Sequence, residues 1–314
     1  YLRIYLLGMP VILLYNFEAA IFRSIGDTKV PLKALTMSGI LNVLLNLFFV
    51  IRLQMDVAGV ALATVISQCI SAALVIRCLM RENGALHLDL KKLKIHPMKF
   101  KQIMQVGIPA GLQGMLFSLA NVTVQSSINS FDNTVLVAGS AASSSVENFV
   151  YANVNSFYQA NTAFTSQNYG AGNLRRCRLC TRTGIFLDLC GMAIMSVFCL
   201  GFAGPIIGLF SSDPEVIRLG VIRVWYVVLP ESINVFLEVL SDALRGYGIS
   251  TPPALIALFG ICGFRLAWIF LYFPHSPTFE TLMAVFGLSW AITAFFLAIA
   301  YVWYMRRLEP AARA

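Results

Sequence analysis

The chain has few charged residues for its length. Only 12% of its 314 residues are Asp, Glu, Lys or Arg, whereas a typical soluble domain carries about 25%. The chain is 58% hydrophobic, and its mean hydropathy is +0.75. A soluble protein of this size could not bury so much apolar surface, so the composition predicts an integral membrane protein whose main partner is the lipid bilayer.

The sequence also lacks the common motifs of enzymes and metal sites. It contains no phosphate-binding Walker loop, no zinc-protease helix and no Gly-x-Ser-x-Gly elbow. Cys177 and Cys180 have the spacing of a redox or zinc pair, but no second pair or histidine lies near them, and the other cysteines are scattered. His87, His96 and His275 lie in predicted loops. We therefore expect no enzymatic activity, no bound metal and no cofactor.

What the sequence does have is a repeated corner between apolar segments. Arg23-Ser-Ile-Gly26-Asp-Thr-Lys-Val-Pro31 ends one such segment and begins the next, and Arg245-Gly-Tyr-Gly248-Ile-Ser-Thr-Pro-Pro253 repeats its Arg, Gly and Pro at one constant offset. Gly permits the turn, Pro suits the first turn of a helix, and Arg stops a span at the lipid headgroups. Such a repeat is typical of transporters built from two related halves.

Hydropathy and length predict nine membrane-spanning helices, each long enough to cross the hydrocarbon core. The fifth is so polar that a hydropathy scan alone would miss it. The predicted spans are 4–22, 32–51, 57–80, 104–130, 144–168, 183–210, 217–244, 253–273 and 281–304.

A basic stretch from Arg81 to Lys101 predicts both the orientation and the division of the chain. When this stretch is placed in the cytoplasm, most of the 23 Lys and Arg fall on the cytoplasmic side. We therefore expect a multi-pass protein of the plasma (inner) membrane with a cytoplasmic carboxy terminus. The net charge of +8 then needs no nucleic-acid partner.

The predicted domains are a partial amino-terminal lobe of three spans (1–80), a cytoplasmic linker (81–103) and a carboxy-terminal lobe of six spans (104–314). The repeat pairs the first span with the seventh, so a complete half would have six spans. We accordingly expect an all-α, two-lobed helix bundle with nine of twelve spans present, as a fragment without the first three helices.

Three stretches resemble the multidrug and toxic compound extrusion (MATE) transporters, and together they cover essentially the whole chain. On this resemblance the nine spans correspond to helices four to twelve of the family. The stretches are Gly8-Met-Pro10 running to the corner that ends at Pro31, Val106-Gly107-Ile108-Pro109, and Thr165-Ser-Gln167-Asn168-Tyr-Gly170-Ala171-Gly172-Asn173.

The resemblance implies a two-lobed transporter that exports amphipathic cations in exchange for H⁺ or Na⁺. Relatives in the same superfamily flip lipid-linked saccharides, so a flippase is the nearest alternative. A membrane-embedded enzyme and a passive channel are more distant alternatives. We expect the protein to act as a monomer.

In the amino-terminal lobe, the resemblance implies a cation-coupling site at Asn42, Asn46 and Thr64. Asn42 and Thr64 match the family pattern, whereas Asn46 stands where relatives often have Asp. From the residues alone, the two Asn side chains could equally hold helices together by hydrogen bonds. In the other lobe, the resemblance implies that some sodium-coupled relatives carry a glutamate at the position of Phe117. Because phenylalanine has no carboxylate, we do not predict a cation site there.

The carboxy-terminal lobe has its own intramembrane polar residues. Glu147, Asn153, Gln159 and Asn161 belong to the polar fifth span, which lipid alone could not solvate, so we predict that it lines a cavity. Glu231 and Glu238 are seven residues apart on the seventh span and share a helix face; we expect both to face the cavity as well.

Arg265 is the one basic residue predicted deep within a span. An unpaired guanidinium is costly at mid-membrane, so we expect a buried ion pair with Asp188 or Glu238. The pair could be structural, or it could switch during transport.

Overall fold

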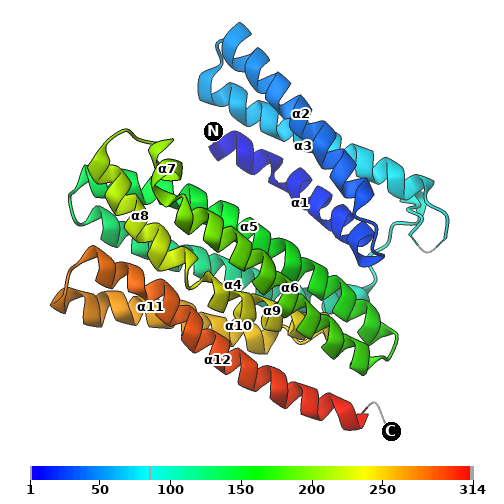
Figure 1. Cartoon of the computed structure of the whole chain (residues 1–314). Helices are drawn as coiled ribbons and strands as arrows, with labels where there is room; N and C mark the ends of the chain where they lie inside the picture. The colour runs from blue at the N-terminus through cyan, green and yellow to red at the C-terminus, as the bar shows by residue number, and fades with distance from the viewer. Residues whose placement is uncertain (1, 85, 312–314) are drawn as a thin grey trace. The chain divides into compact units, whose positions relative to one another are not determined.

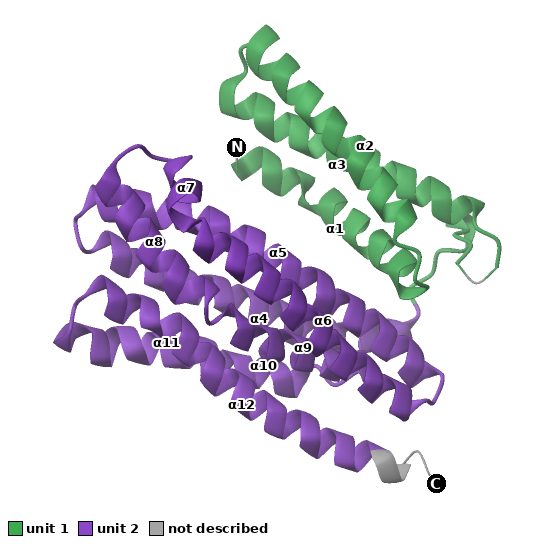
Figure 2. Cartoon of the chain, in the orientation of Figure 1, with its two compact units in different colours: residues 1–95 green, residues 96–314 purple. Residues whose placement is uncertain are grey.

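The computed structural model describes residues 2–84 and 86–311. The predicted amino-terminal lobe begins at residue 1 and the predicted carboxy-terminal lobe ends at residue 314, and both of these residues lie outside the described part. Within that part every regular element is helical, which confirms the predicted all-α class. The chain divides into two compact units, Tyr1–Ile95 (unit 1) and His96–Ala314 (unit 2), coloured separately in Figure 2. The boundary falls within the residues predicted as a linker.

Unit 1 is built on its third helix. α1 (Leu2–Ser24) and α2 (Lys29–Leu47) both pack against α3 (Asp56–Arg81). A π-helical turn, η1 (Phe48–Arg52), extends α2, and a short 3-10 helix, η2 (Leu90–Lys92), lies in the basic stretch. The core of the unit gathers at the corner between α1 and α2, where Gly26 has a φ of 84° that other residues rarely adopt.

Unit 2 contains the remaining helices, several of which are interrupted (Figure 1). They are α4 (Pro97–Asn129), α5 (Thr134–Gly170), α6 (Leu174–Gly201), α7 (Ala203–Gly208), α8 (Pro214–Val228), α9 (Glu231–Gly246), α10 (Thr251–Ala257), the π-helical η3 (Leu258–Gly263), α11 (Phe264–Ala267), the π-helical η4 (Trp268–Tyr272), the 3-10 helix η5 (Phe273–His275) and α12 (Phe279–Ala311).

Seven helical segments among the described residues are long and apolar enough to cross a membrane. α5 does not qualify despite its length, as expected from its polar composition. The predicted span 217–244 is two helices, α8 and α9, because the chain turns at Pro230, which cannot donate a backbone hydrogen bond.

The predicted span 183–210 was placed too far along the chain. The Asn173 side chain accepts a hydrogen bond from the Arg176 amide, so α6 begins before the basic residues and not after them. α6 ends at Gly201, and the separate α7 contains the rest of the apolar run.

α5 positions the polar groups of unit 2 because it packs against α6, α8 and α9. Its first turn is capped by Asn133, whose side chain accepts from the amides of Val135 and Leu136. Small residues then let α5 approach its neighbours closely. At Gly139, an added methyl group would come within 2.8 Å of the Val216 carbonyl oxygen of α8.

Candidate functional site

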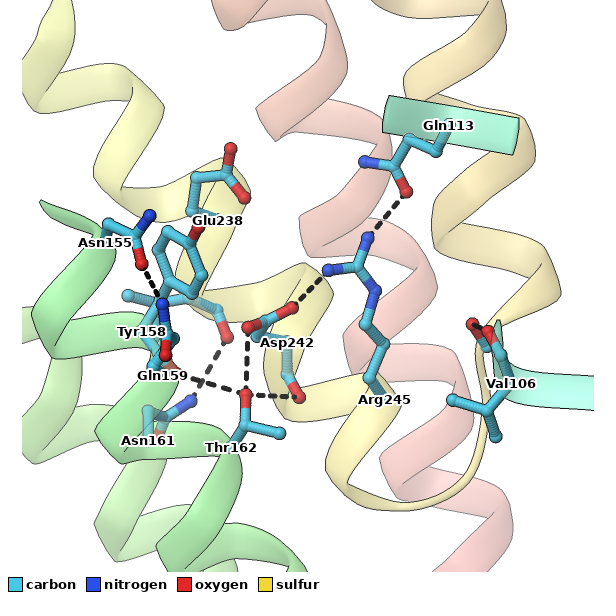
Figure 3. A network of polar contacts seen from close by, with 12 residues as sticks. Val106, Gln113, Asn155, Tyr158, Gln159, Asn161, Thr162, Glu238, Asp242 and Arg245 are labelled. Atoms are coloured by element: carbon cyan, nitrogen blue, oxygen red, sulfur yellow. Dashed lines mark hydrogen bonds and ion pairs between the residues drawn. The ribbon is translucent and has the colours of Figure 1, made fainter. Parts of the chain in front are cut away.

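The charged end of α9 is held by hydrogen bonds from two other helices (Figure 3). Thr162 Oγ1 of α5 donates to Asp242 Oδ2 at 2.9 Å. Arg245 forms an ion pair with Asp242 and donates from Nη2 to Gln113 Oε1 of α4 at 2.6 Å. This polar group therefore ties α4, α5 and α9 together at the repeated corner.

One turn earlier on α9, Glu238 faces two tyrosines of α5. Tyr151 donates its hydroxyl to Glu238 Oε1 at 3.4 Å and lies 3.4 Å from the hydroxyl of Tyr158. Asn161 Nδ2 donates to the Val239 carbonyl oxygen at 3.3 Å. Glu238 and Asn161 thus lie along the same α5–α9 contact, whereas Gln159 is exposed and bonds to Asn155 (Figure 3).

Glu147 of α5 forms a bidentate ion pair with Arg223 of α8. Arg223 Nε lies 2.7 Å from Glu147 Oε1, and Nη2 lies 2.9 Å from Oε2. Arg223 also donates to Ser140. Both charged side chains line a cavity of about 320 Å³ in unit 2 with Asn121, Asn148 and Phe286 among the other lining residues. Arg223 lies near the start of the predicted span 217–244, and it is 6% exposed.

The predicted ion pair of Arg265 with Asp188 or Glu238 is wrong. Among the described side chains, no carboxylate lies within salt-bridge distance of this guanidinium. Instead, Nε donates to Ser289 Oγ at 3.1 Å and Nη1 donates to Asn121 Oδ1 at 2.7 Å.

Aromatic rings complete the surroundings of Arg265. Its guanidinium carbon lies 4.5 Å from the centroid of Phe286 and 5.3 Å from that of Phe117. Neutral oxygens and aromatic ring faces therefore stabilise the buried guanidinium in place of the predicted carboxylate.

Asp188 of α6 and Glu231 of α9 are both buried, but they differ in their contacts. Glu231 accepts from Asn234 Nδ2 at 2.8 Å. Asp188 is 0% exposed, and neither carboxylate oxygen has a hydrogen-bond partner among the described residues. Asn153, predicted to line a cavity, is half-buried where α5 meets α6, and its Nδ2 atom also lacks a partner.

In unit 1, the predicted coupling residues form one connected polar group. Asn46 Nδ2 donates to Asn42 Oδ1 at 3.0 Å, and Asn42 Nδ2 donates to Ser67 Oγ of α3 at 3.2 Å. Ser67 Oγ in turn donates to the Thr64 carbonyl oxygen at 2.9 Å. The Asn46 Oδ1 atom is buried and has no partner in the described structure.

Sequence reasoning missed Gln113, Asn121 and Ser67, which are neutral polar residues on otherwise apolar helices. Each forms a hydrogen bond with a residue that the sequence analysis names. In the sequence, these residues could have been found only as polar side chains whose helical spacing places them on the core-facing side of a helix. Arg223 was missed because a basic residue near a span end normally marks the headgroups.

Family models match both parts of the chain. The MatE model matches residues 109–271, slightly more than half of the chain. A second model, described as lipid II flippase MurJ, matches residues 1–114.

Curated relatives match across both units at low identity. A probable multidrug resistance protein, YoeA of Bacillus subtilis, is 24% identical over 98% of this chain and 68% of its own length. A probable multidrug resistance protein NorM of Thermotoga maritima is 25% identical over 86% of this chain and 59% of its own length. An FAD transporter of Shewanella oneidensis is 25% identical over 69% of this chain and 49% of its own length. The chain thus spans about half to two thirds of these relatives.

Solved structures share the fold. A crystal structure of MATE in complex with MaL6 matches with a TM-score of 0.90 at 18% identity, over 99% of this chain and 70% of that chain. A MOP superfamily transporter from Pyrococcus furiosus matches with a TM-score of 0.88 at 18% identity, over 98% of this chain and 69% of that chain. With the family model matching residues 109–271, the chain belongs to the MatE family.

Proposed function

We propose that this chain is part of a secondary active transporter that exports amphipathic small molecules, cationic ones in particular, by antiport with H⁺ or Na⁺. The observation that carries the proposal is the polar chemistry within the helix bundle of unit 2, above all the half-buried Glu238 and the buried Asp242 of α9. Ionisable residues are expensive inside a bilayer and occur there mainly where they serve transport. The names of the multidrug resistance relatives support the same activity.

Ion coupling is assigned to polar groups in both units. Asn42, Asn46 and Thr64 in unit 1 offer neutral oxygens, and the acids of unit 2 offer charge. A coupling ion drives export only when it binds two transport states with unequal affinity. Glu238 suits such a difference because its hydrogen bond to the hydroxyl of Tyr151, at 3.4 Å, is long and easily exchanged for another partner.

We further propose a monomeric, multi-pass protein of the plasma (inner) membrane with a cytoplasmic carboxy terminus. The support is the positive-inside rule, because Lys91, Lys92 and Lys94 are exposed at the end of unit 1 and Arg175 and Arg176 are exposed in the first turn of α6.

The experiment is ethidium uptake into inside-out membrane vesicles that contain the chain, energised by a proton or a sodium gradient, because export from the cell corresponds to uptake by such vesicles. Glu238→Gln keeps the shape of the side chain and removes its charge, so gradient-driven transport should fall at least tenfold at equal protein level. Glu280→Gln, at an exposed glutamate in the first turn of α12, is the matched control and should transport normally. Equal transport by the parent and Glu238→Gln would remove the acid from the mechanism.

A lipid-linked saccharide flippase is the second candidate, favoured by the MurJ match over residues 1–114. A diphosphate headgroup calls for guanidinium groups. Arg223 and Arg265 are buried in unit 2, but Arg223 is paired with Glu147, and neutral oxygens accept from Nε and Nη1 of Arg265, which leaves only its Nη2 without a partner among the described residues. Flipping of a fluorescent undecaprenyl diphosphate lipid in proteoliposomes, with no ethidium efflux, would favour this candidate over the first.

A further inference from the structure

Asp188 is a fully buried acid that the proposed mechanism does not use. It lies on the face of α6 that contacts α5 and α9, with Thr181 and Met192 on the same face. Its side chain is 0% exposed, and both of its oxygens lack a hydrogen-bond partner in the described structure.

Two carboxamides of α5 lie along the same contact, one helical turn to either side of Asp188. A methyl group on Gly184 would come within 3.1 Å of Asn161 Oδ1, and one on Gly191 would come within 3.1 Å of Asn153 Nδ2. Asn161 Oδ1 and Asn153 Nδ2 are themselves buried atoms with no partner. The contact therefore contains an unsatisfied acceptor, an unsatisfied donor and, between them, an unsatisfied carboxyl group.

Among the described residues, no cation of the helices packed against α6 forms an ion pair with this carboxyl group. Arg223 of α8 is paired with Glu147, Arg245 of α9 is paired with Asp242, and α7 has no titratable side chain. The titratable groups nearest along these helices are themselves acids or phenols, namely Glu238 and Asp242 of α9 and Tyr151 and Tyr158 of α5. An ionised Asp188 would thus be a buried charge with no counter-charge and no donor, which proteins avoid by neutralising the group.

We propose that Asp188 is a proton-binding site within unit 2 and carries its proton in the state described here. A neutral carboxyl group has one donor and one acceptor face. In this proposal its hydroxyl donates to Asn161 Oδ1 and its carbonyl oxygen accepts from Asn153 Nδ2 once these side chains rotate towards it. One proton then gives a partner to both Asp188 oxygens, to Asn161 Oδ1 and to Asn153 Nδ2.

The site deepens the proposed function and rests on it in one respect. If the chain is an antiporter, Asp188 makes H⁺ a ligand of unit 2, at a place separate from the polar group of unit 1. Proton binding at Asp188 can be measured without any transported compound, so its outcome is independent of whether ethidium is exported.

The test uses the whole chain in lipid nanodiscs and compares the parent with Asp188→Asn. Asparagine has the donor and acceptor of a neutral acid but cannot lose a proton. The infrared band of a protonated carboxyl carbonyl should be present in the parent and should lose intensity in the variant. An acid that is protonated only in the folded state makes stability fall as pH rises, because unfolding releases its proton. The melting temperature of the parent should therefore fall more steeply with rising pH than that of Asp188→Asn, and the difference should correspond to one proton released on unfolding.

Asp132→Asn is the matched control, because Asp132 is exposed, and it should leave both signals unchanged. If Asp188→Asn does not fold, Asn161→Ala should shift the same infrared band by removing its hydrogen-bond acceptor. The proposal is overturned if the band and the pH slope match between parent and Asp188→Asn. It is equally overturned if Na⁺, and not K⁺, stabilises the parent but not the variant, because the site would then bind sodium.

Discussion

Arg265 is held inside unit 2 by neutral groups. Its guanidinium spreads one charge over a planar group, so it can stack on Phe286 while it donates to Asn121 and Ser289 in the plane. Phe117 also offers a ring face to the same guanidinium. The planar shape of arginine is therefore essential at this position.

We expect Arg265→Lys to destabilise the protein although it keeps the charge. Lysine can neither stack in the same way nor donate along two fixed directions, so the free energy of unfolding should fall by about 2 kcal/mol. The control is Arg218→Lys, because Arg218 forms an exposed pair with Glu215 and such pairs contribute about 0–1 kcal/mol. Thermal unfolding in detergent compares the two, and equal shifts would contradict the role of the planar group.

We expect Asn42→Ala and Thr64→Ala to weaken ion-coupled export without preventing membrane insertion. Each removes a neutral polar group whose pairing is worth about 1 kcal/mol, which corresponds to a several-fold weaker ion affinity. Ethidium efflux measured across a series of sodium concentrations and pH values checks this. Asn16→Ala is the control, since Asn16 is exposed and bonds only within its own helix. Parent-like ion dependence in both variants would leave these residues with a purely structural role.

The ion pair that the sequence predicted for Arg265 is wrong, whereas the roles of the selected acids and carboxamides stay predictions. Glu238, Asn161 and Asn42 could be selected because polar residues in apolar helices stand out. Arg265 was mispaired because its depth can be read from the sequence, whereas its direction cannot. Rotation about a helix axis decides which neighbour a side chain meets, and the π-helical turns before and after α11 alter that rotation.

Helix contact in unit 2 depends on small residues. Gly139 of α5 lies against Gly220 of α8, and the Ser143 hydroxyl donates to the Gly220 carbonyl oxygen at 2.8 Å. This contact brings Glu147 and Arg223 into range of each other, one or two turns further along the same two helices. The ion pair and the close contact are therefore parts of a single α5–α8 interface.

We expect Gly139→Ala to destabilise the protein and Gly111→Ala to stabilise it slightly. The methyl group at 139 meets backbone atoms of α8 at 2.8 and 3.0 Å, whereas nothing lies within 4 Å of one at 111. Forcing extra volume into a packed contact costs about 1–3 kcal/mol, and Ala in place of an unconstrained helical Gly gains about 0.5–1 kcal/mol. Melting temperatures should shift in opposite directions. If the melting temperature shifted in the same direction in both variants, helix propensity and not the close α5–α8 contact would determine the effect of Gly139→Ala.

For the molecule as a whole, the repeated corner proved the most useful sequence feature. Gly26 and Gly248 both adopt positive φ, at 84° and 78°, and each ends one long helix before another begins. Composition and hydropathy were sufficient for the all-α membrane class, whereas the family was predicted from the resemblance of three stretches of sequence. They could not reveal the break at Pro230 or the start of α6, because those depend on individual capping and turn residues.

We expect limited trypsin digestion in detergent to cut first at the end of unit 1, next to its boundary with unit 2. Lys91, Lys92 and Lys94 are exposed in a stretch whose only regular element is the short η2, whereas most other basic sites begin or end long helices. Mass spectrometry should find a pair of fragments that end and begin in this stretch. A variant with Gln at these three positions should resist the cut, and early cleavage within α5 or α9 would contradict the division into units.

The π-helical turns of the segment from α10 to η5 have a consequence for insertions and deletions. A π turn accommodates one residue more than an α turn, and each residue added to a helix rotates all later residues of that helix by about 100°. η3 immediately precedes α11, so it sets the direction in which Arg265 points. Loss of one residue from η3 would restore a regular α-helix and swing the guanidinium away from Asn121 towards a different neighbour. Substitutions in η3 should thus be tolerated far better than any change in its length.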